Sequence, residues 1–222
     1  MSALPLAGRH VTDAAVRAFH WMFALAFAGA WLTAESERWR LVHVTLGYTL
    51  AGLLAFRLLW GGIGPRPARL SVLARKLGGL PGWLDGLRAG RPNWRQAQNL
   101  LMALTIALLL LAVLPLTLSG FAADQDWGGG WLGEALEELH EGAANAMLAL
   151  VLLHLGLIAV LSGLRGRFLA RPMLTGRVPG PGPDLLSRRQ RITAALAATV
   201  MAIAVIAFWG WQWTQTLAAT QP

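Results

Sequence analysis

The sequence predicts an all-α integral membrane protein, in which a bundle of four transmembrane helices is followed by a fifth, C-terminal transmembrane helix. Three observations support this fold class. Of the 222 residues, 55% are hydrophobic and only 14% are charged, a composition more apolar than that of a soluble domain of this size. The apolar residues gather in five stretches, each close to the roughly 20 residues that a helix needs to cross a bilayer. The charged residues lie mainly in the segments between these stretches.

The five apolar stretches cover about 15–34, 41–60, 98–119, 141–163 and 192–213. The first lacks a short apolar core followed by a small-residue cleavage site, so a retained helix is favoured over a signal peptide. The second is short but rich in small and apolar residues, and tilt or helix packing can accommodate it. Near the end of the fifth lie Trp209, Trp211 and Trp213, where tryptophans commonly anchor a helix at the membrane interface.

The basic residues predict the orientation of these helices. All but two of the 19 Lys and Arg residues lie in the N-terminal tail and in the loops after the second and fourth stretches. The other two loops hold Arg38 and Arg40 together with most of the acidic residues. Because cytoplasmic loops carry the excess of Lys and Arg, we expect a multi-pass protein of the bacterial inner membrane with a cytoplasmic N-terminus and a periplasmic C-terminus.

Two connecting segments have patterns of their own. Residues 65–95 interleave leucines and Trp83 with basic residues, which favours a short amphipathic helix at the membrane surface. Residues 172–183 are rich in Pro and Gly and lack a helical pattern, so they predict a linker. The expected organisation is a transmembrane domain over 1–170, a basic cytoplasmic linker over 171–191 and an additional transmembrane helix over 192–222.

Composition excludes several classes of site. The chain has no cysteine, so it cannot form disulfides, attach haem covalently through C-x-x-C-H or bind an iron–sulfur cluster through thiolates. The net charge of +8 does not predict a nucleic-acid partner, because membrane topology and contact with anionic lipid account for basic loops. No catalytic triad, phosphate-binding loop or paired carboxylate is apparent, and we predict no catalytic residue.

Four of the five histidines, His20, His43, His140 and His154, lie in or at the ends of the apolar stretches. An ionisable side chain inside a membrane is costly and therefore indicates function. His140 and His154 are separated by about 21 Å along one helix and lie close to the same face. The alternating chain direction predicts His20 at the cytoplasmic depth of His154, and His43 at the periplasmic depth of His140.

Two pairs of imidazoles at two depths are what two b-type haems with bis-histidine ligation require. Zinc would need three or four ligands converging on one point, and a proton relay would not predict two matched depths. Since bis-histidine ligation leaves no open position at the iron, the pattern favours electron transfer. Arg17, one turn before His20, and Arg57, on the same face as His43, could pair with haem propionates. Positive-inside anchoring explains both arginines equally well.

At this point the chain resembles the bacterial cytochrome b561 family and the related b-type cytochrome subunits of nickel–iron hydrogenases. The resemblance covers roughly residues 11–170 and is carried by Arg17-x-x-His20-Trp21, His43-x-x-x-Gly47 continuing to Arg57, and His140-Glu141 with His154. It implies a four-helix bundle that holds two b haems on the same histidine pairs and exchanges electrons with ubiquinone or menaquinone. Two features depart from the family: residues 91–95 replace a His-Asn-Pro-Leu-Gly-like stretch, and the fifth helix exceeds the four-helix form.

The leading hypothesis is a di-haem b-type cytochrome that transfers electrons across the membrane between the quinone pool and a periplasmic cytochrome c or oxidoreductase subunit. The acidic outer loops would steer a basic partner. One alternative is a stand-alone superoxide:quinone oxidoreductase, although those loops would repel an anionic substrate unless Arg38 and Arg40 form a local patch. The other is a haem-free membrane anchor or transporter. If the protein is an enzyme, we expect a quinone-linked oxidoreductase.

Overall fold

The computed structural model describes residues 8–219, and five of its helices are long and apolar enough to cross a membrane. They are α1 (Ala14–Thr33), α2 (Arg40–Ile63), α5 (Trp94–Asp124), α6 (Trp131–Leu164) and α8 (Arg188–Ala219). The prediction of an all-α protein with five spans is confirmed. Several helices continue past the apolar stretch, since polar residues at their ends still complete helical turns. The predicted domain over 1–170 and the predicted helix over 192–222 include residues 1–7 and 220–222, which lie outside the described part of the chain.

Side-chain caps fix where the first and third spans begin. The Asp13 carboxylate accepts a hydrogen bond from the Val16 backbone N–H at 2.8 Å and thereby caps α1. Asn93 caps α5 in the same way, through the backbone N–H of Gln96 at 3.0 Å. These groups satisfy donors that have no partner inside the helix. The caps therefore set which residues of each helix reach the middle of the bundle.

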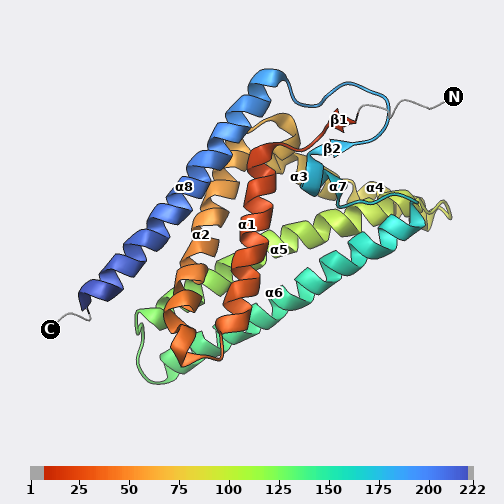
Figure 1. Ribbon diagram of the computed structural model, residues 1–222. Helices are drawn as coiled ribbons and strands as arrows, with labels where there is room; N and C mark the ends of the chain where they lie inside the picture. The colour runs from red at the N-terminus through yellow and green to blue at the C-terminus, as the bar shows by residue number, and fades with distance from the viewer. Residues whose placement is uncertain (1–7, 220–222) are drawn as a thin grey trace.

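The long helices form two antiparallel hairpins, α1 with α2 and α5 with α6, and Figure 1 shows the second hairpin inclined to the first. The core between them is a cluster of buried apolar side chains: Ala26, Phe27, Leu50, Leu54, Val113, Leu116 and Met147. Helix α8 packs against α1 and α2 through Ala194 and Met201. The fifth span therefore covers the first hairpin and leaves the face of α6 that points away from α5 largely exposed.

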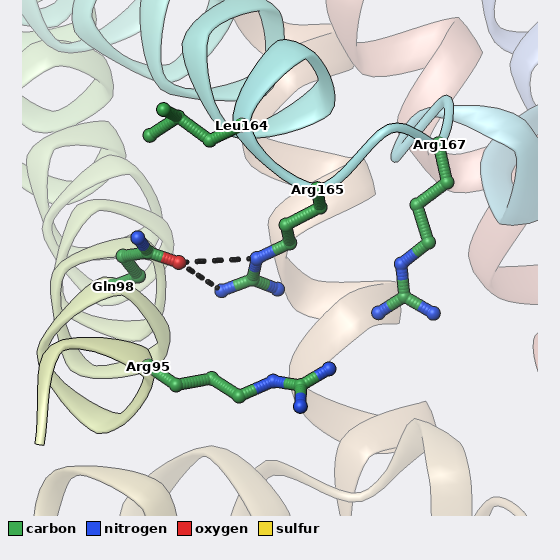
Figure 2. A pocket seen from close by; sticks show the side chains of 5 residues that line it. All are labelled: Arg95, Gln98, Leu164, Arg165 and Arg167. Carbon is green, nitrogen blue, oxygen red and sulfur yellow. Dashed lines mark hydrogen bonds between the residues drawn. The ribbon is translucent and has the colours of Figure 1, made fainter.

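The two ends of the bundle differ in charge. We call basic end the one formed by residues 64–93 and 165–187, and acidic end the one formed by residues 34–39 and 125–141. Figure 2 shows the guanidinium groups of Arg95, Arg165 and Arg167 around one cavity of about 400 Å³ at the basic end. Among them, Arg165 is held by two hydrogen bonds from Nε and Nη2 to Gln98 Oε1.

The amphipathic helix expected between the second and third spans is confirmed, but it is broken in two. Helices α3 (Leu70–Leu77) and α4 (Leu80–Arg88) are separated by Gly78 and Gly79, and they follow the short 3₁₀ helix η2 (Arg66–Ala68). A second 3₁₀ helix, η1 (Glu37–Trp39), joins α1 to α2. Two consecutive glycines are poor helix formers, which explains why one amphipathic segment becomes two.

The Pro/Gly-rich segment after α6 is more ordered than the predicted linker. It contains a short helix, α7 (Arg171–Thr175), and a strand, β2 (Arg177–Val178), which pairs antiparallel with β1 (Arg9–His10). Gly176 adopts a φ of +74° between α7 and β2, a conformation that favours glycine. The segment was expected to lack helical structure, and α7 and the glycine turn that follows it correct that expectation.

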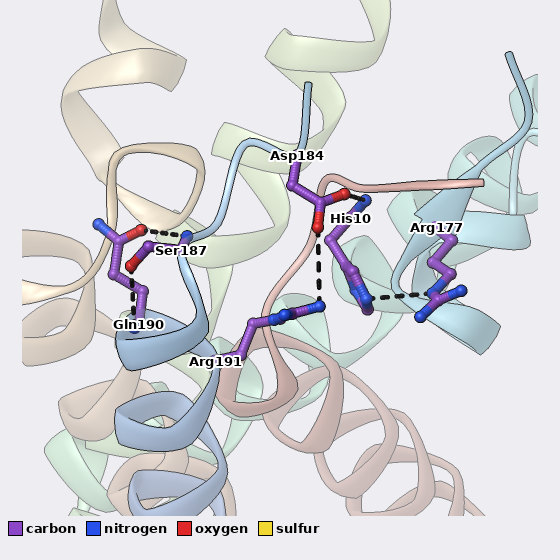
Figure 3. A network of polar contacts seen from close by, with 6 residues as sticks. All are labelled: His10, Arg177, Asp184, Ser187, Gln190 and Arg191. Carbon is purple, nitrogen blue, oxygen red and sulfur yellow. Dashed lines mark hydrogen bonds and ion pairs between the residues drawn. The ribbon is translucent and has the colours of Figure 1, made fainter. Parts of the chain in front are cut away.

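The same contact continues into a polar network, which we call the clasp (Figure 3). The Asp184 carboxylate accepts a hydrogen bond from the His10 backbone N–H at 2.7 Å and lies 3.6 Å from the Arg191 guanidinium. The Arg177 Nε–H donates to Nε2 of His10 at 3.1 Å. The clasp thus ties the tail before α1 to the segment that leads into α8.

The clasp should loosen as the pH falls. Partial burial, followed by the nearby Arg177 charge, lowers the pKa of His10. Its backbone N–H lowers the pKa of Asp184. Both pKa values are lower in the clasp than when it is open, so protonation opposes the clasp: protonation of His10 does so below its ordinary pKa of about 6.5, and that of Asp184 only below its ordinary pKa of about 3.9.

We therefore expect faster amide hydrogen exchange in residues 176–187 at pH 5.5 than at pH 7.5, after correction for intrinsic rates. His10→Asn removes the titrating group and should reduce the difference between the two pH values. An equal pH response in this variant and the wild type would show that His10 does not control the clasp.

Candidate functional site

His43 and His140 lie together at the acidic end, where the first hairpin meets the second. Their ring centroids are 6.1 Å apart and their planes are at 81° to each other. Two metal–imidazole bonds in line span about 4 Å between the nitrogen atoms. Each ring centre lies behind its metal-binding nitrogen, so two ring centres on either side of one metal atom are farther apart than the nitrogens. The observed separation of 6.1 Å agrees with that arrangement.

A hydrogen bond from Nδ1 orients each of these two rings. Nδ1 of His43 lies 2.9 Å from the Ala30 carbonyl oxygen on α1, and Nδ1 of His140 lies 2.9 Å from the Leu116 carbonyl oxygen on α5. A carbonyl oxygen only accepts, so Nδ1 carries the proton and the neutral ring keeps its lone pair on Nε2. Metal-binding histidines are commonly held in this way.

His140 also lies directly against the backbone of α5. A Cβ atom at Gly120 would lie 2.7 Å from Cε1 and 2.9 Å from Nδ1 of His140. The Ser119 hydroxyl lies 3.4 Å from the same Nδ1. The His140 imidazole can therefore occupy this position only because residue 120 has no side chain.

His20 and His154 form the second pair, toward the basic end. Both side chains are half-buried, and their charges are close enough to interact. Nδ1 of each ring is buried without a hydrogen-bond partner among the described residues. A buried polar atom without a partner is costly and commonly marks a functional position. The structure thus brings together the same histidines that the sequence assigned to common depths.

An apolar layer separates the two pairs. Phe27, Leu50 and Met147 each lie seven residues from a histidine of their own helix, which is about 10.5 Å along the axis. Their exposed fractions are only 7%, 2% and 1%. The two pairs are therefore separated by closely packed side chains from three helices, a region that excludes water.

The two arginines predicted near the histidines are at the basic end and contact backbone carbonyls. Arg17 donates from Nε to the Met173 carbonyl oxygen at 3.3 Å and from Nη2 to that of Leu174. Trp21 donates to the same Met173 oxygen at 3.1 Å. These carbonyls end α7, where a positive charge is favourable. Sequence reasoning missed this link between α1 and α7.

Arg57 has a comparable contact on α2. Its Nη1 donates to the Ala68 carbonyl oxygen at 3.0 Å, so it holds η2 against the end of the second span. The side chain is half-buried and forms no ion pair with a described residue. Each arginine thus has a structural contact and keeps further donors, and their role toward a propionate stays a prediction.

The two glycines near the histidines differ in their surroundings. A Cβ at Gly29 would lie 3.0 Å from Cδ1 of Leu46, which is close packing between α1 and α2. A Cβ at Gly47, one turn from His43, would meet no atom within 4 Å. The helix surface one turn from His43 is therefore open at Gly47, whereas Gly29 is closely packed.

Gly120→Ala should lower the stability of the protein by about 1–3 kcal/mol, because the added methyl group overlaps the His140 ring and forces it to move. Gly156→Ala is the matched control on α6, since a Cβ there meets no atom within 4 Å. Helix propensity predicts that this second change is neutral or slightly stabilising. Thermal unfolding in detergent, followed by circular dichroism, compares them, and equal melting temperatures would contradict the argument.

Comparison with known proteins adds one finding. A family model described as prokaryotic cytochrome b561 matches residues 11–176. This stretch contains α1, α2, α5 and α6 with all four paired histidines, and it ends before α8 begins. Neither a curated protein nor a solved structure matches the chain.

Proposed function

The chain belongs to the prokaryotic cytochrome b561 family, and on that premise we propose that it carries two b haems and transfers electrons between the quinone pool and a periplasmic partner. The family is one of membrane b-type cytochromes in electron transfer and is linked to quinone. The five apolar helices make this member a multi-pass membrane protein. The number of haems, their ligands and the orientation in the membrane are part of the proposal.

The pairing of four histidines at two depths carries the proposal. The rings of His43 and His140 have centroids 6.1 Å apart, and their Nδ1 atoms are bound to carbonyl oxygens, which leaves Nε2 of each neutral ring as the atom that can bind iron. His20 and His154 are the ligands proposed for a second haem. A haem with two imidazole ligands supplies one-electron chemistry at its iron and has no open coordination position.

The protein between the two histidine pairs excludes water and sets the distance between them. The layer of Phe27, Leu50 and Met147 keeps water out of the region between the pairs, and the rise of α6 sets about 21 Å between His140 and His154. An electron that passes from one site to the other would cross most of the bilayer's apolar core, which is about 30 Å thick.

Charge supports the orientation. Arginines crowd the basic end, so the positive-inside rule assigns it to the cytoplasm. The N-terminus would then be cytoplasmic and the C-terminus periplasmic. His20 and His154 would hold the haem on the cytoplasmic side, and His43 and His140 the haem on the periplasmic side.

The acidic end would then face the periplasm. Glu134, Glu137, Glu138 and Glu141 are all exposed there, and a basic cytochrome c or oxidoreductase subunit would be attracted to them. The alternative of a superoxide:quinone oxidoreductase needs a positive funnel. Arg40 lies 3.7 Å from Asp124, whose charge offsets its own, and Arg38 is outnumbered by the exposed glutamates of the same end, so the charges do not form one.

The purified protein should contain two b haems per chain in a pyridine haemochrome spectrum. His43→Ala and His140→Ala should each remove one and the same haem signal in a redox titration, and His20→Ala and His154→Ala should each remove the other. Each substitution leaves one iron with a single imidazole ligand.

His10→Ala is the control, since His10 lies in the tail before α1 and should retain both signals. Loss of different haems on changing His43 and His140 would refute the pairing. A protein without haem would refute the function and favour the haem-free anchor or transporter.

Electron exchange with a basic cytochrome c should slow as ionic strength rises from 0.01 to 0.15 M, because the Debye length falls from about 30 to about 8 Å. Glu137→Gln with Glu138→Gln should lower the rate at low salt and weaken its salt dependence. Asp85→Asn, at the basic end, should change neither. A rate that does not depend on salt would remove the electrostatic argument for this partner.

A further inference from the structure

We propose that a cavity between α2, α5 and α8 at the acidic end binds the head group of a quinone, and that the fifth helix is there to complete it. The cavity has a volume of about 620 Å³, within the range of small-molecule sites. It is lined by Arg40, Leu41, Val44 and Tyr48 of α2, Asp124 and Gln125 of α5 and its end, and Phe208, Trp211 and Gln212 of α8.

Several polar groups that line this cavity are bonded to one another. The Tyr48 hydroxyl donates to Oδ2 of Asp124 at 2.7 Å, and the Gln125 amide donates to the same oxygen at 3.2 Å. The Arg40 guanidinium lies 3.7 Å from Oδ1. Tyr48 is the single tyrosine of the chain. The cavity therefore offers donors and one carboxylate acceptor at one edge of an otherwise apolar space.

Aromatic rings form its walls. The Tyr48 ring meets Phe121 at 6.1 Å and Phe208 at 6.4 Å between centroids, in both cases edge to face. Trp211 lies 6.1 Å from Phe208. Aromatic walls with a polar edge suit a flat ring that bears oxygen atoms.

The polar groups match both redox forms of a quinone. The carbonyl oxygens of the oxidised form can accept from Arg40 or from the amide of Gln212, and a hydroxyl of the reduced form can donate to Asp124. The same carboxylate disfavours a phosphate group in the cavity, because like charges repel. A benzoquinone or naphthoquinone therefore fits better than a phospholipid head group.

The position of the cavity links it to the paired histidines, and this step rests on the proposed function. Gly120 lies against the His140 ring, and the next residue of α5, Phe121, lies against Tyr48. Two consecutive residues of α5 thus contact Tyr48 of the cavity lining on one side and the pair of His43 and His140 on the other. A bound quinone would be close to the haem proposed there, and electron exchange between this quinone and a partner at the acidic end would not need the haem on His20 and His154.

Helix α8 is fixed at this place by a specific contact. Nε1 of Trp209 donates to Oγ1 of Thr49 on α2 at 3.0 Å. The helix contributes Phe208, Trp211 and Gln212 to the lining, and it lies outside the stretch that the family model matches. The proposed site would give a function to α8, the one span that the family resemblance left unexplained.

The test is equilibrium binding of tritiated ubiquinone with one isoprene unit, and of a short-chain menaquinone analogue, to the haem-loaded full-length protein in lipid nanodiscs. Trp211→Ala and Trp213→Ala form a matched pair on α8. Their exposed fractions are 56% and 55%, but only Trp211 lines the cavity. We expect Trp211→Ala and Asp124→Asn to raise Kd about tenfold, and Trp213→Ala to leave it within about twofold.

Haem content is measured on the same samples, which separates the two proposals. A raised Kd with both haems retained supports the site. The same Kd in wild type and all three variants overturns the site and leaves the haem assignment intact. A wild type without haem overturns the proposed function, and the dependence of quinone binding on Trp211 and Asp124 would still decide whether the cavity is a quinone site.

Discussion

Two hydrogen bonds between an imidazole and a backbone carbonyl organise the middle of this protein. Each joins the two helices of one hairpin: His43 on α2 to Ala30 on α1, and His140 on α6 to Leu116 on α5. Both carbonyl oxygens also accept from a side-chain hydroxyl, that of Thr33 for Ala30 and that of Ser119 for Leu116, so these polar groups satisfy one another inside the membrane. Because both rings are held by Nδ1, Nε2 of each neutral ring is left free to bind a metal. The register of both hairpins and the geometry of the site are thus set by the same contacts.

The basic end is organised differently, by arginine contacts to the ends of short helices. Arg17 and Trp21 hold the carbonyls of α7, and Arg57 holds η2. These contacts join segments far apart in sequence and close the bundle on that side. The acidic end has fewer such contacts, so its loops and the first turns of α6 stay accessible to water and to a partner.

Much of the architecture could be predicted because hydropathy is summed over long windows and single residues matter little. The five spans follow from this, and so does the common depth of His20 with His154 and of His43 with His140, which depends only on helix rise and chain direction. The ends of helices were less predictable, since polar residues continue α5 and α6 beyond the apolar stretches. The order of the segment after α6 was missed because it depends on glycine turns and on a strand partner more than a hundred residues away.

The sequence predicted how deep in the bundle each site residue lies, but not the direction in which its side chain points or what it contacts. Sequence spacing assigned Arg17 and Arg57 to the faces that carry the histidines, yet their contacts with α7 and η2 depend on how the short helices dock. The cavity around Tyr48 and Asp124 was not predictable either, because α8 completes it and the rotation of that helix is set by packing, as in the bond from Trp209 to Thr49. From sequence alone, Trp211 and Trp213 are equivalent interfacial anchors.

The pairing of β1 with β2, next to the clasp, has a consequence for how the chain assembles. The tail at residues 9–10 emerges first during synthesis, but its partner strand follows only at residues 177–178. The partner strand does not exist until four spans have been made. The N-terminal strand must therefore wait, unpaired, while the spans insert. Its pairing, which joins the beginning of the four-helix unit to its end, can follow only after the fourth span has been made.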